Sequence, residues 1–402
     1  MTVLVAGGGT GGHLYPALAL IETLRRRYGD ALTVGHVGTF RGLESRVLSD
    51  WPDVQRHAIH ARGVLRELSL AAVTALGMNV LGLGQSLAIL RRFRPSVVIG
   101  TGGYTAFAPV LGASLLGIPT IIHEQNVRPG LVTRLLAPRV DRVFLSFPDT
   151  AHCLNAPDAS VVGVPLRDGI RRLRHCSPQA AKAELGIDPK RPLVLAMGGS
   201  NGARTVNDTL LRGWAQLQAR HAQLAIVAGR DATRLRPNAR DADLSVIHHT
   251  PNIGLWMRAA DVAISRAGGS TLSELVALEV PTIAVPWPHA ADDHQTANAR
   301  WFAERGACRW LSERDLGETT LLDETIALLD GSAARAELRE ACNRLAQTEA
   351  HDHLMREVDR YLRHDAPARV LPLYRHRRRW HERLGLVASR ARALGERIGS
   401  SR

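Results

Sequence analysis

The stretch TVLVAGGGTGGH, from Thr2 to His13, decides how this chain folds. It begins with a short apolar strand of the kind that is buried in parallel sheets, and a glycine loop follows. Apolar residues three and four apart then predict a helix from about Leu14 to Tyr28. A strand, a glycine loop and a helix in this order are typical of a doubly wound α/β sheet.

The glycine loop has two interpretations. Its spacing Gly7-x-Gly9-x-x-Gly12 matches the dinucleotide fingerprint, which requires an acidic residue at the end of the second strand. The second strand, residues 32–37, instead runs into Gly38-Thr39-Phe40-Arg41. We therefore favour a loop that binds the diphosphate of a substrate. His13 follows this loop and suits a general base or a diphosphate donor, and the plainer alternative is a surface cap residue.

Two more segments follow buried strands in the same half of the chain. Residues 96–100 lead into the glycine loop Gly100-Thr101-Gly102-Gly103-Tyr104, and residues 119–123 lead into Glu124-Gln125-Asn126. Carboxyl ends of parallel strands share one edge, where open α/β sheets bind ligands. Because polar side chains are costly to bury without partners, we expect this group to face a cleft.

The second half of the chain repeats this architecture. A strand over residues 192–197 precedes a glycine loop at 198–202 and a helix over 205–219, and further strands are expected up to Ser265. Ser200 in this loop can offer its hydroxyl and its backbone N–H to a phosphate. The sequence therefore predicts two domains of the same α/β class.

The segment SRAGGSTLSEL, from Ser265 to Leu275, predicts an anion site in the second half. Two glycines precede a helix start, and Ser270 and Thr271 are suitable N-cap residues. The free N–H groups and positive dipole end of such a helix suit a diphosphate. Glu274 suits a neutral diol, such as the hydroxyls of a ribose. The plainer alternative is a helix cap without a ligand.

Polar side chains suited to sugar hydroxyls follow at His294, Gln295 and Asn298. Another candidate, Asp241-Ala-Asp243, resembles the metal-binding acidic pair of a different transferase class. It lies in a polar loop and does not follow an apolar strand, so we assign it no metal.

Length and cysteine content bound the class of protein. A chain of 402 residues is long enough for two domains with full cores. The four cysteines show no paired spacing, which argues against a disulfide framework or a zinc site and favours a reducing compartment. No signal peptide precedes the first strand, so we expect a cytoplasmic protein.

The net charge of +13 is unevenly distributed. Residues 369–402 hold ten arginines and two glutamates and so supply +8. A basic surface suits anionic lipid or phosphate substrates, and no nucleic-acid-binding signature is present. Apolar residues recur at helical spacing through this tail at Trp380, Leu384, Val387, Ala391, Leu394 and Ile398. They predict an amphipathic helix on an anionic bilayer, and a disordered tail or a helix packed on the body are the alternatives.

Residues 68–90 carry no charge. Their length would span a bilayer, but they contain several polar residues and glycines, and Arg91, Arg92 and Arg94 follow. We interpret them as helices with an exposed apolar face that suits a lipid substrate. The alternative is an ordinary core helix.

Six motifs together, in this order along the chain, resemble the MurG family of glycosyltransferases. They are Gly7 to His13, Gly38-Thr39 with Gly42-Leu43-Glu44, Gly100 to Tyr104, His123 to Asn126, Gly198 to Arg204, and the segment from Ser265 to Ala299. The resemblance extends from about Thr2 to Arg363. It implies two Rossmann-like domains facing across a cleft, the GT-B fold. We expect an acceptor- and membrane-facing domain over 1–163, a UDP-sugar domain over 164–340, a closing helix over 341–365, and a basic extension over 366–402.

The family adds N-acetylglucosamine to a lipid-linked muramyl pentapeptide. The resemblance implies inverting hexosyl transfer from UDP-N-acetylglucosamine to the C4 hydroxyl of the muramyl sugar on undecaprenyl diphosphate, without a cofactor or metal. The enzyme would act at the inner face of the cell membrane. His13 is the first candidate for the general base and Glu124 the second. The substrate-binding residues that the resemblance implies are Thr10, Gly11, Gly12, Tyr104, Asn126, Arg167, Ser200, Thr250, Gly269, Ser270, Thr271, Leu272, Ser273, Glu274, His294, Gln295 and Asn298.

Two positions depart from the family pattern. Val164 stands where the family usually has asparagine, and His249 stands where a large apolar residue often covers the uracil. The backbone near Thr250 would still read the base. Three alternatives remain open: a related transferase with another acceptor, a UDP-N-acetylglucosamine epimerase, and a nucleotide-binding protein without enzymatic activity.

Overall fold

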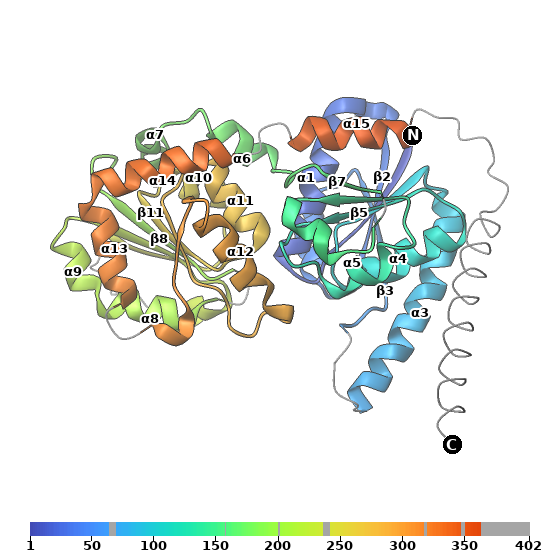
Figure 1. Cartoon of the computed structure of the whole chain (residues 1–402), viewed down its shortest axis with the longest axis horizontal. Helices are drawn as coiled ribbons and strands as arrows, with labels where there is room; N and C mark the ends of the chain where they lie inside the picture. Colours follow the sequence, from blue (N-terminus) through green and yellow to red (C-terminus); the bar gives the residue numbers. More distant parts are fainter. Residues whose placement is uncertain are drawn as a thin grey trace, which may run out of the picture.

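Two parallel β-sheets, each covered by helices, form two lobes that lie side by side (Figure 1). This computed structural model describes residues 1–63, 70–156, 158–199, 202–235, 242–316, 320–346 and 350–362. The predicted α/β class with two Rossmann-like domains is confirmed.

The first sheet has the strand order β3-β2-β1-β4-β5-β6-β7. Its strands are β1 (Thr2–Ala6), β2 (Thr33–Thr39), β3 (Val54–Ile59), β4 (Val97–Gly100), β5 (Thr120–Glu124), β6 (Arg142–Leu145) and β7 (Ala159–Val161). The accompanying helices are α1 (Gly11–Tyr28), α2 (Leu43–Val47), α3 (Leu70–Phe93), α4 (Tyr104–Leu115) and α5 (Leu131–Leu136).

The second sheet has the order β10-β9-β8-β11-β12-β13. Its strands are β8 (Leu193–Met197), β9 (Gln223–Val227), β10 (Leu244–Ile247), β11 (Val262–Ser265), β12 (Thr282–Ala284) and β13 (Arg309–Trp310). The helices from the interdomain junction onward are α6 (Asp168–Leu173), α7 (Pro178–Glu184), α8 (Arg204–Arg212), α9 (Trp214–Gln218), α10 (Ile253–Ala259), α11 (Gly269–Ala277), α12 (His294–Ala303), α13 (Thr320–Asp330), α14 (Ser332–Leu345) and α15 (Ala350–Leu362).

Each sheet reverses its strand order once, and the glycine loops lie at these reversals. In the first sheet Val3 of β1 pairs with Val34 of β2 on one side and with Val97 of β4 on the other. The loops that leave β1 and β4 therefore diverge to opposite faces of the sheet. In the second sheet the corresponding pair is β8 and β11. Such switch points, at the carboxyl ends of the strands, are where open α/β sheets bind ligands.

The end of the described chain returns to the first domain. Helix α15 packs on α1 (Figure 1), and its Leu354, Met355 and Val358 are buried in the core that holds Val3 and Leu14. Within the predicted closing helix, residues 341–365, the helix that returns to the first domain is α15, which begins at Ala350, and the residues up to Leu345 belong to a separate helix, α14, that packs on α11 of the second domain. The predicted amphipathic tail, residues 366–402, lies outside the described residues.

Two other predicted helices have different limits in the structure. Helix α1 begins at Gly11 rather than near Leu14, which places His13 in its first turn. The predicted helix over 205–219 is two helices, α8 and α9, separated by Gly213. A side chain at Gly213 would meet Leu322 of α13 at 2.3 Å, so the close approach of α13 explains the glycine.

Helix α3 projects from the first domain (Figure 1), and it is one helix where the sequence suggested several. Leu76, Val80 and Leu81 on it are more than half exposed. Among the described helices, none combines the length and apolar character needed to cross a membrane.

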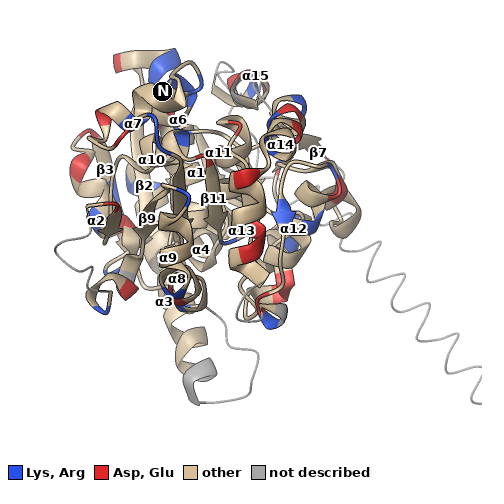
Figure 2. Ribbon diagram, turned by 90° about the vertical axis from the view of Figure 1, so that its left-hand side faces the viewer, with Lys and Arg blue, Asp and Glu red and all other residues tan. Residues whose placement is uncertain are grey.

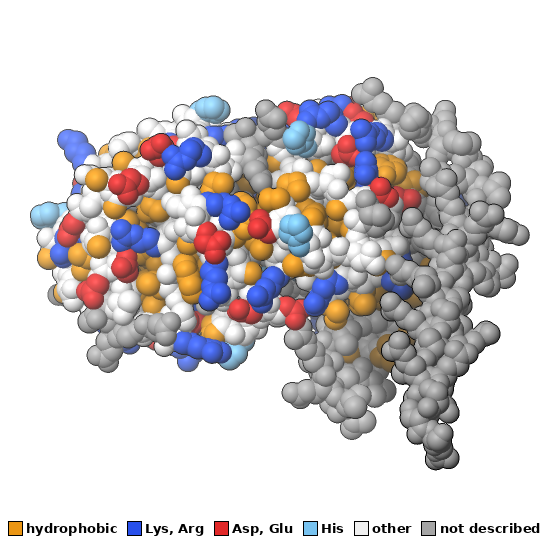
Figure 3. Space-filling model, viewed as in Figure 1, with side chains coloured by type: hydrophobic (Ala, Val, Ile, Leu, Met, Phe, Trp, Pro, Cys, Tyr) orange, Lys and Arg blue, Asp and Glu red, His pale blue; other side chains and the backbone are white. Residues whose placement is uncertain are grey.

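Basic and acidic residues are both scattered over the second domain in Figure 2. The face of that domain seen in Figure 3 likewise carries residues of both charges.

Candidate functional site

The switch points of the two sheets face each other and are in contact. Ser270, in the first turn of α11, lies with its Oγ 3.4 Å from the carbonyl oxygen of Gly12 in α1. Gly269 lies so close to the peptide after β5 that a Cβ there would be 1.9 Å from the oxygen of Gln125. The predicted acceptor and donor loops therefore meet, and a ligand between them requires the domains to separate.

A buried carboxylate, Glu44 of α2, binds the first glycine loop through a hydrogen bond. Its Oε2 accepts the N–H of Gly9 at 3.1 Å, and its Oε1 accepts the N–H and hydroxyl of Thr39 at 2.7 and 2.8 Å. Burial opposes the charge, but these hydrogen bonds outweigh it and hold the pKa of Glu44 below its usual value. Gly9 has φ +80°, and the ring of Tyr104 fills the space where its side chain would be.

His13 lies between the two glycine loops of the first domain. Its Nδ1 is 3.1 Å from the carbonyl oxygen of Thr101 and 3.4 Å from Oε1 of Gln125. Since both neighbours are acceptors, Nδ1 carries the proton and Nε2 is the basic nitrogen. Burial lowers the pKa of His13, and the charge of Glu124 opposes this shift. A neutral imidazole with a free Nε2 suits a general base near pH 7.

Glu124 is a buried carboxylate with both oxygens engaged. Oε1 accepts the backbone N–H and side-chain amide of Asn126, each at 3.0 Å. Oε2 accepts the N–H of Gly130 at 3.0 Å and the hydroxyl of Thr133 at 2.6 Å. Both oxygens of Glu124 already accept hydrogen bonds from the segment after β5. This arrangement does not fit the prediction of Glu124 as an alternative base.

Asn126 and Asn298, both predicted substrate ligands, bind each other across the domain boundary. Nδ2 of Asn298 donates to Oδ1 of Asn126 and to the carbonyl oxygen of Ala267, both at 3.0 Å. Oδ1 of Asn298 accepts the N–H of Val127 at 2.9 Å. Asn298 is fully buried, so the structure gives its amide an interdomain contact where the sequence suggested a sugar contact.

Arg167 and Glu274 are brought together by the junction between the domains. Nε and Nη2 of Arg167 lie 3.0 and 2.9 Å from Oε1 of Glu274. The guanidinium also lies over the ring of Tyr15 in α1, 4.5 Å from its centroid. Burial works against the charge of Arg167, but Glu274 outweighs it and raises the pKa. The junction therefore presents a fixed cation against Glu274 in the second turn of α11 and against Tyr15 of α1.

Helix α11 begins two or three residues earlier than its predicted N-caps imply. Its N-cap is Gly268 and not Ser270 or Thr271, and no side chain caps it. The side chain of Leu272 is buried in the core of the second domain, so only its backbone could contact a ligand. Ser273 lines a small apolar cavity of about 20 Å³ at the junction, together with Phe147 and Val164. The backbone N–H groups of the first turn are thus free of side-chain caps.

The other predicted donor residues lie around this helix end. His294 begins α12, and its Nδ1 lies 2.7 Å from the carbonyl oxygen of Ala291. Gln295 accepts the N–H of Trp287 at 2.9 Å through Oε1. Thr250 accepts the N–H of Asn252 just before α10, and His249 beside it is exposed. Ser200 lies outside the described residues.

Sequence reasoning missed Gln125, His123 and Tyr15 as parts of the site. Gln125 and His123 belong to the motif from which Glu124 and Asn126 were predicted as site residues. Their own roles depend on where their side chains point, which the sequence does not indicate. Glu44 was quoted in a motif but assigned no role. Its position two residues after Gly42, within a quoted motif, was the available signal. Among the described residues, no three histidine, cysteine or acidic side chains gather as a metal site would require.

Comparison with known proteins agrees with this geometry. Residues 3–145 match the glycosyltransferase family 28 N-terminal domain, and residues 193–354 match the glycosyltransferase family 28 C-terminal domain. A solved structure of MurG from Acinetobacter baumannii superposes with a TM-score of 0.66 and 27% identity, covering 89% of this chain and 99% of that one.

Curated relatives extend the match over nearly the whole chain. A protein of Desulforudis audaxviator is 38% identical over 90% of this chain and 98% of its own length, and one of Syntrophotalea carbinolica is 37% identical over 89% and 98%. Both are named UDP-N-acetylglucosamine–N-acetylmuramyl-(pentapeptide) pyrophosphoryl-undecaprenol N-acetylglucosamine transferase. The chain therefore belongs to the MurG family, with the two domains of glycosyltransferase family 28.

Proposed function

We propose that this enzyme transfers N-acetylglucosamine from UDP-N-acetylglucosamine to the C4 hydroxyl of a muramyl pentapeptide carried on undecaprenyl diphosphate, with inversion at the anomeric carbon. The observation that carries the proposal is that two different sites, one in each domain, face each other. The uncapped N-terminus of α11, the helix whose Glu274 pairs with Arg167, lies against a glycine loop that bears a neutral histidine. The relatives named for this reaction match 90% and 89% of this chain.

The donor belongs in the second domain in this proposal. The first turn of α11, Gly269 to Ser273, binds the diphosphate through its N–H groups and its positive dipole end. Glu274 accepts hydrogen bonds from the ribose hydroxyls, since Arg167 is bound through Oε1. The backbone near Thr250 binds the uracil, and His294 and Gln295 lie at the sugar. Ser200 is assigned to the diphosphate on the sequence alone.

The acceptor belongs in the first domain. The turn Thr10 to Gly12, at the N-terminus of α1, binds the lipid diphosphate, with Tyr104 beside it. Nε2 of His13 removes the proton from the C4 hydroxyl as its oxygen bonds to the anomeric carbon. The bond from that carbon to the donor diphosphate breaks, and UDP leaves with the bonding electrons. Arg167 and the α11 N-terminus stabilise the charge that develops on UDP.

Glu124 takes a supporting role in this scheme. Its buried charge lies near His13 and opposes the effect of burial on the pKa of that histidine. It therefore stabilises the imidazolium that forms when His13 takes the proton, while its own oxygens stay bound to the turn at Asn126 and Thr133.

The direct test is incubation with labelled UDP-N-acetylglucosamine, with and without the muramyl lipid. Label should enter the lipid only when the acceptor is present. Conversion of the donor to another free nucleotide sugar without acceptor would identify an epimerase instead. Transfer to a different lipid but not to the muramyl lipid would identify a transferase with another acceptor.

A lipid-linked acceptor implies that the enzyme acts at the inner face of a membrane. Helix α3 supports this part of the proposal, because Leu76, Val80 and Leu81 are exposed apolar side chains on a projecting helix (Figure 1). The basic tail supports it by sequence only. Replacing these three residues by serine, or ending the chain after Asp365, should lower binding to anionic vesicles. Vesicle binding equal to that of the unaltered chain in both variants would exclude the membrane role.

A further inference from the structure

Gln125 contacts both His13, the proposed general base, and the donor domain. It follows β5 and is 1% exposed. Its Oε1 faces Nδ1 of His13 at 3.4 Å, and its carbonyl oxygen lies against Gly269 of the donor domain. It is therefore in contact with both sides of the reaction centre although the preceding scheme gives it no role.

The direction of the Gln125 amide is determined by its neighbours. Nε2 lies 2.8 Å from the carbonyl oxygen of His123 and 2.8 Å from Nδ1 of the same residue. A reversed amide would place Oε1 against that carbonyl oxygen, and two acceptors would then face each other. Nε2 therefore donates toward His123, and Oε1 is left to accept from His13.

His123 continues the chain of hydrogen bonds to the domain junction. Its Nε2 lies 2.8 Å from the carbonyl oxygen of Gly163, which can only accept, so Nε2 carries the proton. Nδ1 then has the lone pair that accepts from Gln125. Burial lowers the pKa of His123 and keeps the ring neutral. One consistent set of donors and acceptors thus runs from Gly163, where the first domain ends, to His13.

We propose that Gln125 is a positioning residue that, together with His123, holds the ring of His13 in the orientation and tautomer required of the general base and links that ring to the domain junction. The proposal rests on the proposed function, because it takes His13 as the base. Thr101 supplies one backbone acceptor to Nδ1, and Gln125 supplies the second. Without the Gln125 acceptor, only the carbonyl oxygen of Thr101 holds Nδ1, and the ring can turn more freely about its Cβ–Cγ bond.

The first test is Gln125→Met, which keeps the size of the side chain and removes both its donor and its acceptor. We expect kcat to fall about tenfold, the effect of one hydrogen bond, while both KM values stay within a factor of two. The acid limb of the pH profile of kcat should move to lower pH, because the hydrogen bond that His13 donates to Gln125 raises the pKa of His13. The other charged groups that act on His13, Glu124 from β5 and His294 from α12, are unchanged in this variant.

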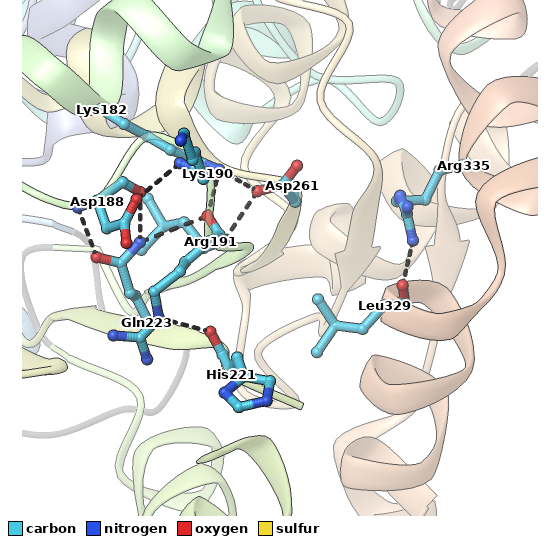
Figure 4. Close-up of polar contacts among 10 residues, drawn as sticks. Lys182, Asp188, Lys190, Arg191, His221, Gln223, Asp261, Leu329 and Arg335 are labelled. Atoms are coloured by element: carbon cyan, nitrogen blue, oxygen red, sulfur yellow. Dashed lines mark hydrogen bonds and ion pairs between the residues drawn. The ribbon is translucent and has the colours of Figure 1, made fainter. Parts of the chain in front are cut away.

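The matched control is Gln223→Met. Gln223 is also buried, and its amide is bonded to the backbone of Asp188 and Arg191 at the far end of the second sheet (Figure 4). It should lose stability without any shift of the pH profile. A Gln125→Met enzyme that keeps its kcat and pH profile, or that changes only in parallel with its melting temperature as the control does, overturns the proposal.

Two measurements separate this inference from the proposed function. Nitrogen-15 spectra of the histidine rings in the substrate-free protein, assigned with His13→Gln, should show His13 titrating at lower pH in Gln125→Met. An unchanged titration contradicts the positioning role even if transfer is observed. A shifted titration in a protein that transfers no sugar leaves the positioning of His13 intact and refutes only the reaction.

A double-mutant cycle tests the link through His123. His123→Phe removes Nδ1, one of the two acceptors of Gln125 Nε2, and leaves the backbone carbonyl oxygen, so its effect on kcat should overlap with that of Gln125→Met. The double variant is then expected to be little slower than the slower single variant. Fully additive effects would show that His123 and Gln125 act separately and would overturn the proposed chain. Should His123→Phe fail to fold, the titration in Gln125→Met decides the proposal.

Discussion

Arg167 holds Glu274 through a single carboxylate oxygen, Oε1, with Nε at 3.0 Å and Nη2 at 2.9 Å. The same guanidinium covers Tyr15 of the first domain. The pair therefore lies where the donor helix, the junction and the first domain meet. A cation at this point neutralises the buried carboxylate of Glu274.

Replacing Glu274 by alanine should raise the donor KM while the protein stays folded. The lost hydrogen bonds to a charged group are worth about 1.5–3 kcal/mol, which corresponds to a rise of roughly 10- to 150-fold. Glu304→Ala is the control, because the side chain of Glu304 is 71% exposed. Steady-state kinetics with varied donor measure the effect. A donor KM equal to that of the control would remove Glu274 from the site.

Replacing His13 by glutamine should lower kcat about 10²- to 10⁴-fold, the usual cost of losing a general base. Donor affinity, measured by calorimetry, should stay nearly constant because His13 belongs to the first domain. If affinity for the donor collapsed while kcat held, the two domains would have the opposite substrates.

The pH dependence of the unaltered enzyme follows from the environment of His13. Burial lowers its pKa from the ordinary value, so the base stays neutral to lower pH than a free histidine would. Activity should therefore be retained as the pH falls to 6.5 and be lost only below it, as the ring gains a proton. An acid limb of kcat/KM centred above pH 6.5 would contradict this assignment.

Replacing Glu124 by glutamine distinguishes a supporting carboxylate from a base. The new amide would face donors from Gly130 and Thr133, or from Asn126, so stability should fall by about 1–3 kcal/mol. Removal of the charge should also move the acid limb to lower pH, because Glu124 raises the pKa of His13. Loss of kcat as large as in His13→Gln, with the stability unchanged, would make Glu124 the base.

Replacing Lys182 by methionine tests the stability of the second domain away from the site. Lys182 Nζ lies 2.6 Å from Oδ2 of Asp261 and 2.7 Å from the carbonyl oxygen of Arg191, in the network of Figure 4. Its side chain is buried, so the change leaves Asp261 without its counter-charge. The free energy of unfolding in urea should fall by about 3–5 kcal/mol. The exposed Lys190→Met is the control, and an equal loss in both variants would refute the role of burial.

The sheets could be predicted from the sequence because their signals are local. The strands around Val3 and Val194 are apolar runs that end at glycines, and the order of strand, loop and helix determines a doubly wound sheet. The position of the site at the glycine loops follows from the same rule. The division of residues 332–362 into α14 and α15 was missed because both segments have helical periodicity and only their partners in space differ.

Side-chain roles within the site could be predicted less well. Sequence position indicated that Glu124, Asn126 and Asn298 lie at the cleft, but not that protein groups already bind them. Satisfaction of a buried polar group depends on residues more than 100 positions away, as Asn126 and Asn298 illustrate. The N-cap expected at Ser270 lies at Gly268, and Gly269 after it lies against Gln125 of the first domain, a contact that the sequence does not indicate.

The central claim is that sugar passes from a donor in the second domain to a muramyl lipid in the first, with His13 as the base. The most direct measurement is the proton NMR spectrum of the disaccharide lipid made by the unaltered enzyme, compared with the yield from His13→Gln under the same conditions. The account predicts a new β-linked N-acetylglucosamine on the C4 oxygen of the muramyl sugar, with the product reduced at least 100-fold in the variant. An α linkage, a different linked oxygen, or an undiminished yield from His13→Gln would contradict it.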